Sequence, residues 1–371
     1  MAILLTGATG YIGAHVLANL LERRPEDVTV LVRAGDPGRL WKALQVHIPD
    51  EQRFRELLDT RLRIVPGDLT AERFGLDRAQ YDALAESSDS IIHSAATLNR
   101  RSERACMNVN LRGTLAMIQL ARRARERGGL RRFSQVSTVA VAGKRIDEVV
   151  TEDDAIDWSR ADYDPYARTK KFAEHMVAEL LPDIERVVFR PSIVLGDSRS
   201  PETTSFEMVR AFAFLARLPA LPLCATDLVD IVPVDYVADA IQALHCGPTP
   251  KHSVYNLSSG RGSPTFRDIT TRLAQAESKG RSGPWYWPWS EPLFSGGIAL
   301  GSMLMRGTGL GRACTRMRVF MPYLKWNTVF DNQRIVDELG FKPAPFVDYC
   351  APLLRWSLEH RFTYPYREWT E

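Results

Sequence analysis

The chain begins with a short apolar run that ends on a glycine-rich turn. Residues 2–6 read AILLT, and glycines follow at positions 7, 10 and 13. An apolar run that stops at glycine predicts a buried strand, and residues 11–22 have the pattern of a helix. This order and spacing suit a loop that holds a dinucleotide. Its first glycine permits a tight turn, its second lets the backbone approach a pyrophosphate, and its third allows close packing of helix on strand.

Further apolar runs alternate with helical patterns along the first half of the chain. The predicted strands are 28–33, 62–66, 89–93, 132–138 and 186–190. The longest predicted helix, 103–127, places Met107, Leu111, Leu115 and Ile118 on one face. Alternating strands and helices predict an α/β fold, a Rossmann-type doubly wound parallel sheet covered on both sides. Right-handed crossovers place the carboxyl ends of its strands at one edge, where ligands bind.

The second half of the chain is less regular. It shows helical patterns at 206–217 and 233–246 and a strand at 253–257, and its last part, 326–361, reads as a loop followed by two helices. We expect a Rossmann NADP-binding domain over 1–246, with a substrate-domain insertion at about 196–230. Residues 247–371 would then form a smaller, mainly helical C-terminal substrate-binding domain.

The end of the second predicted strand bears on the cofactor. In NAD-binding proteins an acidic residue near this point binds the ribose 2′-hydroxyl, whereas this chain has Arg33, followed by Arg39 and Lys42. A guanidinium pairs with a 2′-phosphate, which favours NADPH; the alternative is an exposed loop arginine. Asp68 could accept a hydrogen bond from the adenine amine, and small residues after the fourth strand leave room for the cofactor. The predicted cofactor site comprises Gly7, Thr9, Gly10, Tyr11, Ile12, Gly13, Arg33, Arg39, Asp68, Leu69, Ser94, Ala95, Ala96, Lys170, Pro191 and Ile193.

Candidate catalytic residues follow the fifth predicted strand. That strand ends at Thr138, and Tyr166 precedes Lys170 by four residues, which puts both on one face of a helix. Lys170 could bind the nicotinamide ribose and lower the pKa of Tyr166, which would then donate a proton to a carbonyl that receives hydride. The Thr138 hydroxyl could hold the same oxygen as it gains charge. Asn110 could orient Lys170 through water or backbone.

These motifs together resemble an extended short-chain dehydrogenase/reductase. The resemblance rests on TGATGYIG, Asn110 followed by Gly113 and Thr114, VST at 136–138 and YARTK at 166–170. LVRA at 31–34, VSTVAV at 136–141, VVFRPSIVLGDSR at 187–199 and DIVPVDYVADAI at 230–241 are similar to the thioester-reductase and fatty acyl-CoA reductase branch, the male-sterility-type reductases. In that branch a threonine takes the place commonly held by serine, which points to Thr138. The resemblance covers 1–260. It implies NADPH-dependent reduction of a thioester, carried by coenzyme A or an acyl carrier protein, to an aldehyde or onward to an alcohol.

Two other functions stay open. An extended reductase of this kind could act on a free carbonyl or hydroxyl group of a sterol, a ketide or a nucleotide sugar, although Arg33 argues against an NAD-dependent sugar epimerase. The other is that the protein binds a dinucleotide as a sensor without catalysing a reaction. The intact set of Thr138, Tyr166 and Lys170 argues against this hypothesis.

Composition bears on partners and compartment. The net charge of +3 gives no case for nucleic acid, and five cysteines without a C-x-x-C pair predict free thiols, a reducing compartment and no metal site. No leader or membrane span is expected, so we predict a cytoplasmic protein. The Trp-rich segment 285–305 is either a lid packed on the core or an interfacial element in peripheral contact with a membrane. The arginines after it could meet the phosphates of a carrier: Arg306, Arg312, Arg316 and Arg318. The sequence does not indicate the oligomeric state.

Overall fold

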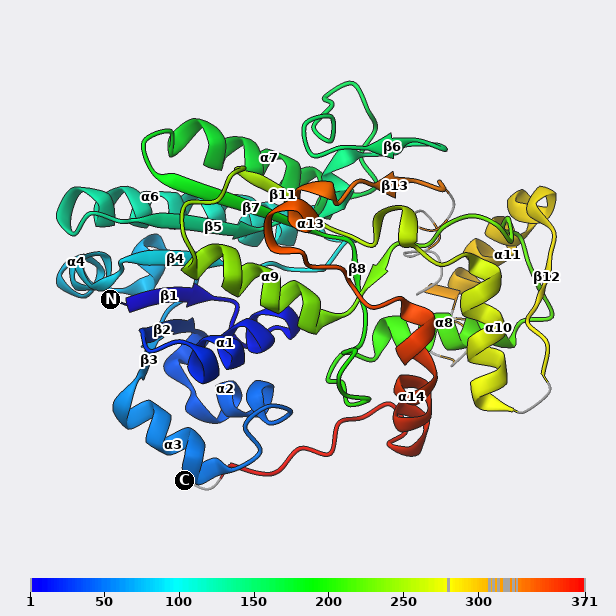
Figure 1. Ribbon diagram of the computed structural model, residues 1–371, viewed down its shortest axis with the longest axis horizontal. Helices are drawn as coiled ribbons and strands as arrows, with labels where there is room; N and C mark the ends of the chain where they lie inside the picture. The colour runs from blue at the N-terminus through cyan, green and yellow to red at the C-terminus, as the bar shows by residue number, and fades with distance from the viewer. Residues whose placement is uncertain are drawn as a thin grey trace.

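A seven-stranded parallel sheet forms the centre of the molecule (Figure 1). The computed structural model describes residues 2–278, 281–305, 308, 311, 314, 315, 321, 324 and 326–369. The strands lie in the order β3-β2-β1-β4-β5-β7-β11, and each pairs in parallel with its neighbours. Their bounds are β1 Ala2–Thr6, β2 Asp27–Val32, β3 Leu62–Pro66, β4 Ser90–His93, β5 Arg132–Val136, β7 Glu185–Pro191 and β11 Val254–Leu257. The predicted Rossmann-type sheet is confirmed, and its strand order reverses between β1 and β4, where ligands of such sheets bind.

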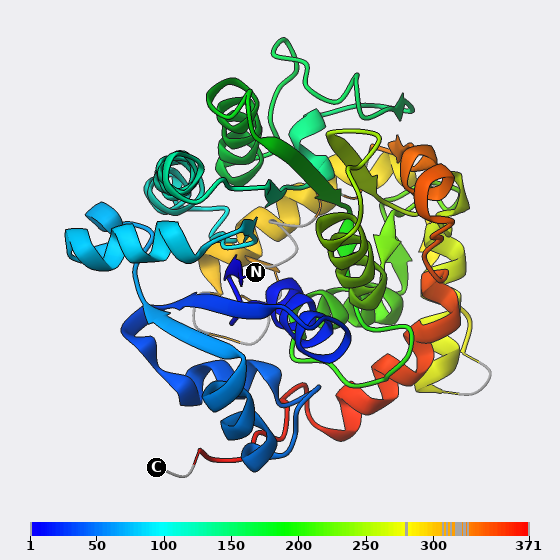
Figure 2. The same cartoon turned by 60° about the vertical axis from the view of Figure 1, so that its left-hand side comes forward.

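Helices cover both faces of the sheet, as the turned view shows (Figure 2). Each face carries its own cluster of buried apolar side chains. On one face lie α1 Tyr11–Arg23, α2 Pro37–Leu44, α3 Glu51–Thr60, α9 Val234–Cys246 and α13 Gln333–Leu339. On the other face lie α4 Arg78–Ser87, α6 Gly113–Arg127 and α7 Pro165–Leu180.

The helix predicted over 103–127 is confirmed in its extent, but it contains a π-helical turn. It consists of α5 Glu103–Cys106, one π-helical turn Met107–Arg112, and α6. The π turn holds Asn110, whose side chain is buried and hydrogen-bonded to the backbone of Thr97. A π turn inserts an extra residue into the helical repeat, and such turns often occur at functional sites. Met107, which we expected on one face with Leu111, Leu115 and Ile118, is 37% exposed, whereas Ile118 is buried.

A second apolar core lies beside the sheet, to the right in Figure 1. Its helices are α8 Glu207–Arg217, α10 Phe266–Glu277, α11 Glu291–Leu304 and α14 Phe346–Glu359. Short strands accompany them in three parallel pairs: β6 Val149–Val150 with β13 Val329–Phe330, β8 Ile193–Val194 with β10 Ile231–Val232, and β9 Ala220–Leu221 with β12 Trp285–Tyr286. The second core thus draws on chain from both sides of α9.

The chain passes between the two cores several times. β11 lies beyond residue 246 and yet is the edge strand of the main sheet, and Ile335 of α13 packs in the core beside α1. Residues 196–230 contribute Val209, Leu221 and Val229 to the second core. The division into domains at 246 stays a prediction.

The Trp-rich segment has one face on the second core and one face outside. Ile298 of α11 is buried and Phe294 packs against the second core, whereas Trp285 and Trp289 are 75% and 76% exposed. Within the described ranges, no helix is long and apolar enough to span a bilayer. Arg306, Arg312, Arg316 and Arg318 lie outside the described residues.

Candidate active site

A cavity of about 930 Å³ opens at the carboxyl ends of β1, β4 and β5. Its walls include every predicted site residue except Asn110. Segments far apart in the sequence therefore meet at one place: the glycine loop, Arg33 and Arg39, Asp68, the 94–96 segment, and the Tyr166 and Lys170 pair. Met208 and Leu324 of the second core also line this cavity, as does Trp326.

The glycine loop is shaped by close backbone approaches. Gly7 has φ +79, and a Cβ there would lie 2.6 Å from the Ala95 nitrogen. A Cβ on Gly13 would lie 2.1 Å from the Gly7 oxygen, so only glycine fits at either position. Gly10 N–H donates to the Gly7 carbonyl at 2.8 Å and closes the turn. The first turn of α1 then presents N–H groups without intrahelical partners to the cavity, a favourable place for a phosphate.

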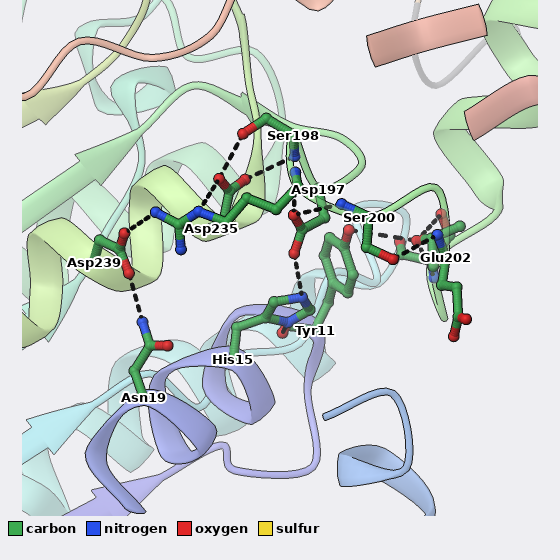
Figure 3. A network of polar contacts seen from close by, with 12 residues as sticks. Tyr11, His15, Asn19, Asp197, Ser198, Ser200, Glu202, Asp235 and Asp239 are labelled. Carbon is green, nitrogen blue, oxygen red and sulfur yellow. Dashed lines mark hydrogen bonds and ion pairs between the residues drawn. The ribbon is translucent and has the colours of Figure 1, made fainter. Parts of the chain in front are cut away.

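Polar contacts fix α1 against α9 and the chain after β8. Figure 3 shows Asp197 facing His15 and Asp239 facing Asn19 of α1, whereas Asp235 accepts hydrogen bonds from Ser198. Asn19 Nδ2 donates to Asp239 Oδ1 at 2.8 Å, and His15 Nε2 lies 3.7 Å from Asp197 Oδ2. These contacts hold the helix that carries the loop.

The adenosine end of the cavity carries the basic residues. Arg33 begins a 3-10 turn after β2, Arg39 lies on α2, and both side chains are exposed at the cavity wall. Asp68 accepts hydrogen bonds from the Thr70 N–H at 2.8 Å and the Thr70 hydroxyl at 2.7 Å. These bonds, with a smaller effect of Arg33, lower the pKa of Asp68. Lys42 is directed elsewhere, with its Nζ 4.7 Å from the centre of the Tyr366 ring.

The catalytic candidates lie together at the other end. Thr138 follows β5, while Tyr166 and Lys170 project from α7, and all three are buried. Lys170 Nζ donates to the Val136 carbonyl at 2.7 Å, so its ammonium lies directly under the end of β5. The spacing therefore brings together the three side chains that we expected to act on one carbonyl.

The pKa of Tyr166 shifts opposite to our expectation. Burial raises it, and the opposing effect comes mainly from the Arg100 guanidinium, which lies 4.6 Å from the centre of the ring, with a smaller one from the Thr138 side chain. Lys170 is not among the groups that lower it. The phenol therefore stays protonated at neutral pH, which suits a proton donor.

Asn110 lies behind the cavity wall. Its side chain bonds to the backbone of Thr97 and donates to Thr169 Oγ1 at 3.3 Å. It thus links the segment after β4 to α7 one residue before Lys170. Its predicted role in orienting Lys170 stays a prediction.

Sequence reasoning missed several polar residues around this site. Arg100 also pairs with Asp164 at 3.2 Å, and its place over Tyr166 could not be read from any motif. Behind Ser137, Glu174 and Arg190 form a buried ion pair at 2.7 Å. The four-residue step from Lys170 to Glu174 indicates that Glu174 lies on the same face of the helix, but nothing in the sequence indicates its pairing with Arg190.

A second missed pair of side chains lies on the cavity wall itself. Ser192 and Asp230 both line the cavity. Burial raises the pKa of Asp230 to about 7, and one of its oxygens accepts a hydrogen bond from the Ser259 N–H at 2.8 Å. Asp230 lies in the segment DIVPVDYVADAI at 230–241, from which we predicted a family resemblance but no role for Asp230.

The Lys170 amine gives a pH-dependent prediction. Burial lowers its pKa from 10.5 to about 8. Below pH 8 the folded and unfolded chains both hold the proton, and the cost of burying the charge is felt in full. Between pH 8 and 10.5 only the unfolded chain holds the proton, so stability rises with pH.

We expect the free energy of unfolding of the wild type, relative to Lys170→Met, to rise by about 1 kcal/mol per pH unit in this window. Urea unfolding across the window measures this difference, and a difference for Lys170→Met that does not change with pH would contradict the shift.

Known proteins provide an independent comparison. Residues 5–241 match the family model described as Male sterility protein. The chain is 33% identical over 290 residues to a component of the linear gramicidin synthase of Brevibacillus parabrevis, an alignment that covers 75% of this chain and 5% of that protein. It is 29% identical over 311 residues to the L-2-aminoadipate reductase large subunit of Penicillium chrysogenum, covering 78% of this chain and 22% of that protein. The chain thus spans a small part of these relatives.

A solved structure agrees over nearly the whole chain. The terminal R domain from the myxalamid PKS-NRPS biosynthetic pathway superposes with a TM-score of 0.80 at 24% identity, covering 97% of this chain and 91% of that one. At this identity the likeness shows the fold alone. The family match extends from β1 to α9 and includes the glycine loop, Thr138, Tyr166 and Lys170. The chain therefore belongs to the Male sterility protein family of NAD-binding domains.

Proposed function

We propose that this protein is an NADPH-dependent acyl-thioester reductase, which converts an acyl group carried by coenzyme A or an acyl carrier protein to an aldehyde. One observation carries the proposal: Thr138, Tyr166 and Lys170 line the same cavity as the glycine loop and the two arginines of the adenosine end. Two relatives support it by name, an L-2-aminoadipate reductase and the terminal R domain of a PKS-NRPS pathway.

The residues present fit NADPH. Gly7 and Gly13 permit the close backbone approaches that shape the loop at the cavity wall, and the N-terminus of α1 suits the pyrophosphate. Arg33 and Arg39 would pair with the 2′-phosphate, and Asp68 would accept a hydrogen bond from the adenine amine. When bound, the cofactor supplies a hydride.

The side chains at the other end would handle the charge that forms on the substrate. Hydride addition to the thioester carbonyl gives a tetrahedral oxyanion, and the hydroxyls of Thr138 and Tyr166 would donate hydrogen bonds to it. Collapse of this intermediate breaks the C–S bond, releases the thiolate, which takes up a proton, and leaves the aldehyde. A second round on the aldehyde would give an alcohol, with Tyr166 donating the proton. No covalent acyl-enzyme is required.

Activity with a substrate panel tests the proposal. The protein should oxidise NADPH when acyl-CoA or acyl carrier protein thioesters are added, with release of free thiol. The alternative is reduction of a free carbonyl, as in a sterol, ketide or nucleotide sugar, by the same three residues. Oxidation with such compounds and with none of the thioesters would establish the alternative and end the thioester proposal.

The cofactor assignment makes its own prediction. Arg39→Ala should weaken NADPH binding by about 10-fold or more, because a charge-assisted bond to the 2′-phosphate is lost, and should leave NADH binding within about 2-fold. Isothermal titration calorimetry with both nucleotides measures the two dissociation constants. Equal weakening of both would contradict the role of Arg39.

Peripheral contact with a membrane stays a prediction. The exposed Trp285, Trp287 and Trp289 are the residues that would enter the lipid interface, and co-sedimentation with lipid vesicles tests it.

A further inference from the structure

The last described residues, 362–369, form an extended strap that joins the second core to the far side of the cofactor half. In Figure 1 it leaves α14, runs along the lower edge of the molecule and ends beside α2 and α3. We propose that this strap positions α2, and through it Arg39, for the 2′-phosphate of NADPH, so that Trp369 is a positioning residue for cofactor preference. The inference rests on the proposed role of Arg39.

The strap covers one complete face of α2. Residues 38, 41, 42 and 45 recur at helical spacing, and each of them meets the strap. A Cβ on Gly38 would lie 3.0 Å from Trp369 Cγ, and the Trp41 ring lies 5.6 Å from the Trp369 ring. Lys42 Nζ lies over the ring of Tyr366.

The last contact on this face is a pair of hydrogen bonds between a side chain and the backbone of the strap, arranged as between two paired residues of neighbouring β-strands. The Gln45 side chain is buried, accepts from the Arg367 N–H at 2.7 Å and donates to the Arg367 carbonyl at 2.9 Å. One accepted and one donated hydrogen bond to the same backbone residue fix both the position of the helix end along the helix axis and its rotation about that axis. Arg367 also donates to the Pro49 carbonyl at 3.0 Å, which secures the loop after α2.

The contacts on the other faces of α2 explain why the strap affects the position of Arg39. Leu40 and Leu44 are fully buried in the core beside α1, and Arg39 is turned to the cavity. The helix has only eight residues and is preceded by a turn in which Ala34 has φ 60. A helix this short gains little stability on its own, so its packing partners decide its position. The buried side chains of Leu40 and Leu44 hold α2 against the core. The strap prevents α2 from rotating about these two side chains.

The strap is anchored in the second core. Arg210 of α8 donates to the Phe362 carbonyl at 2.8 Å, and its guanidinium lies 5.2 Å from the Phe362 ring. Tyr364 packs on Trp356 of α14 and lies 3.4 Å from Glu202. The position of α2 is therefore tied to the substrate side of the cavity as well as to the sheet.

Nucleotide binding tests the inference without relying on turnover. We expect Trp369→Ala to raise the dissociation constant of NADPH about 5- to 10-fold and to leave that of NADH within about 2-fold, because only the 2′-phosphate contact is misplaced. In the Arg39→Ala background, Trp369→Ala should have no further effect, since residues that act through one contact are not additive. Trp289→Ala, an exposed tryptophan on the second core, is the matched control and should change neither constant.

Different failures lead to different conclusions. If Trp369→Ala weakens both nucleotides equally, or adds its full effect to Arg39→Ala, the strap is a general structural support and the inference is overturned. If Arg39→Ala itself leaves the NADPH-to-NADH ratio unchanged, the proposed cofactor assignment fails and the inference falls with it. Should Trp369→Ala not fold, Tyr366→Ala keeps Trp369 in place and removes the ring that lies over Lys42 Nζ of α2, and the same ratios decide.

Discussion

Tyr166→Phe is expected to lower the rate of thioester-dependent NADPH oxidation by about 10²- to 10³-fold, the usual loss when one hydrogen-bond donor to an oxyanion is removed. The phenol is buried beside Thr138 and stays protonated because burial raises its pKa. Phenylalanine keeps the ring and its contact with Arg100, which lies 4.6 Å from the ring centre, so the shape of the cavity is preserved. The loss should therefore appear in kcat, and NADPH should bind within about 2-fold of the wild type.

The same change at Tyr81 on α4 is the matched control, because Tyr81 lies outside this cavity. Tyr81→Phe should leave kcat unchanged. Full activity in Tyr166→Phe would remove the phenol from the chemistry.

The second large effect concerns the glycine loop. Gly13→Ala places a Cβ 2.1 Å from the Gly7 oxygen and 2.6 Å from the Gly7 carbon, which are backbone atoms that cannot swing aside. Overpacking against backbone should cost about 3 kcal/mol of folding free energy, and the displaced loop should no longer bind NADPH measurably. Thermal unfolding and calorimetry measure the two effects.

Gly297→Ala makes the same chemical change within α11, at a position where no atom of the described residues lies within 4 Å of the added Cβ. It should be neutral or slightly stabilising, since alanine favours a helix over glycine by up to about 1 kcal/mol. Normal stability and normal NADPH binding in Gly13→Ala would mean that the loop geometry described above is wrong.

The sheet could be predicted because its strands are short apolar runs that end at turns. The runs at 2–6 and 62–66 match β1 and β3 residue for residue, and 132–138 differs from β5 only because its last two residues leave the sheet. Local periodicity carries this information directly. The cavity followed from topology, since the carboxyl ends of parallel strands meet at one edge.

The π-helical turn at 107–112 could not be predicted in the same way. A π turn differs from an α-helix by one inserted residue, and the apolar repeat around Leu111 reads equally well through it. The Asn110 side chain within this turn bonds to the backbone of Thr97, a tertiary contact that local periodicity does not reveal. The pKa of Tyr166 was missed for a related reason: spacing reveals Lys170, whereas burial and Arg100 belong to the folded state.

The strap was beyond sequence reasoning altogether. Residues 362–369 have no helical or strand period, and Trp369 meets Trp41 from the opposite end of the chain. Nothing local in either segment indicates the contact. The same holds for the second core, where 193–231 and 266–358 combine only after folding.

Product analysis tests the central claim most directly. The protein is incubated with NADPH and a panel of acyl-CoA and acyl carrier protein thioesters, and the products are identified by mass spectrometry. We expect an aldehyde, or an alcohol after a second round, together with free thiol, in wild type and in Tyr81→Phe but not in Tyr166→Phe. Intact thioesters in the presence of bound NADPH, alongside reduction of a free ketone or sugar nucleotide, would contradict the account.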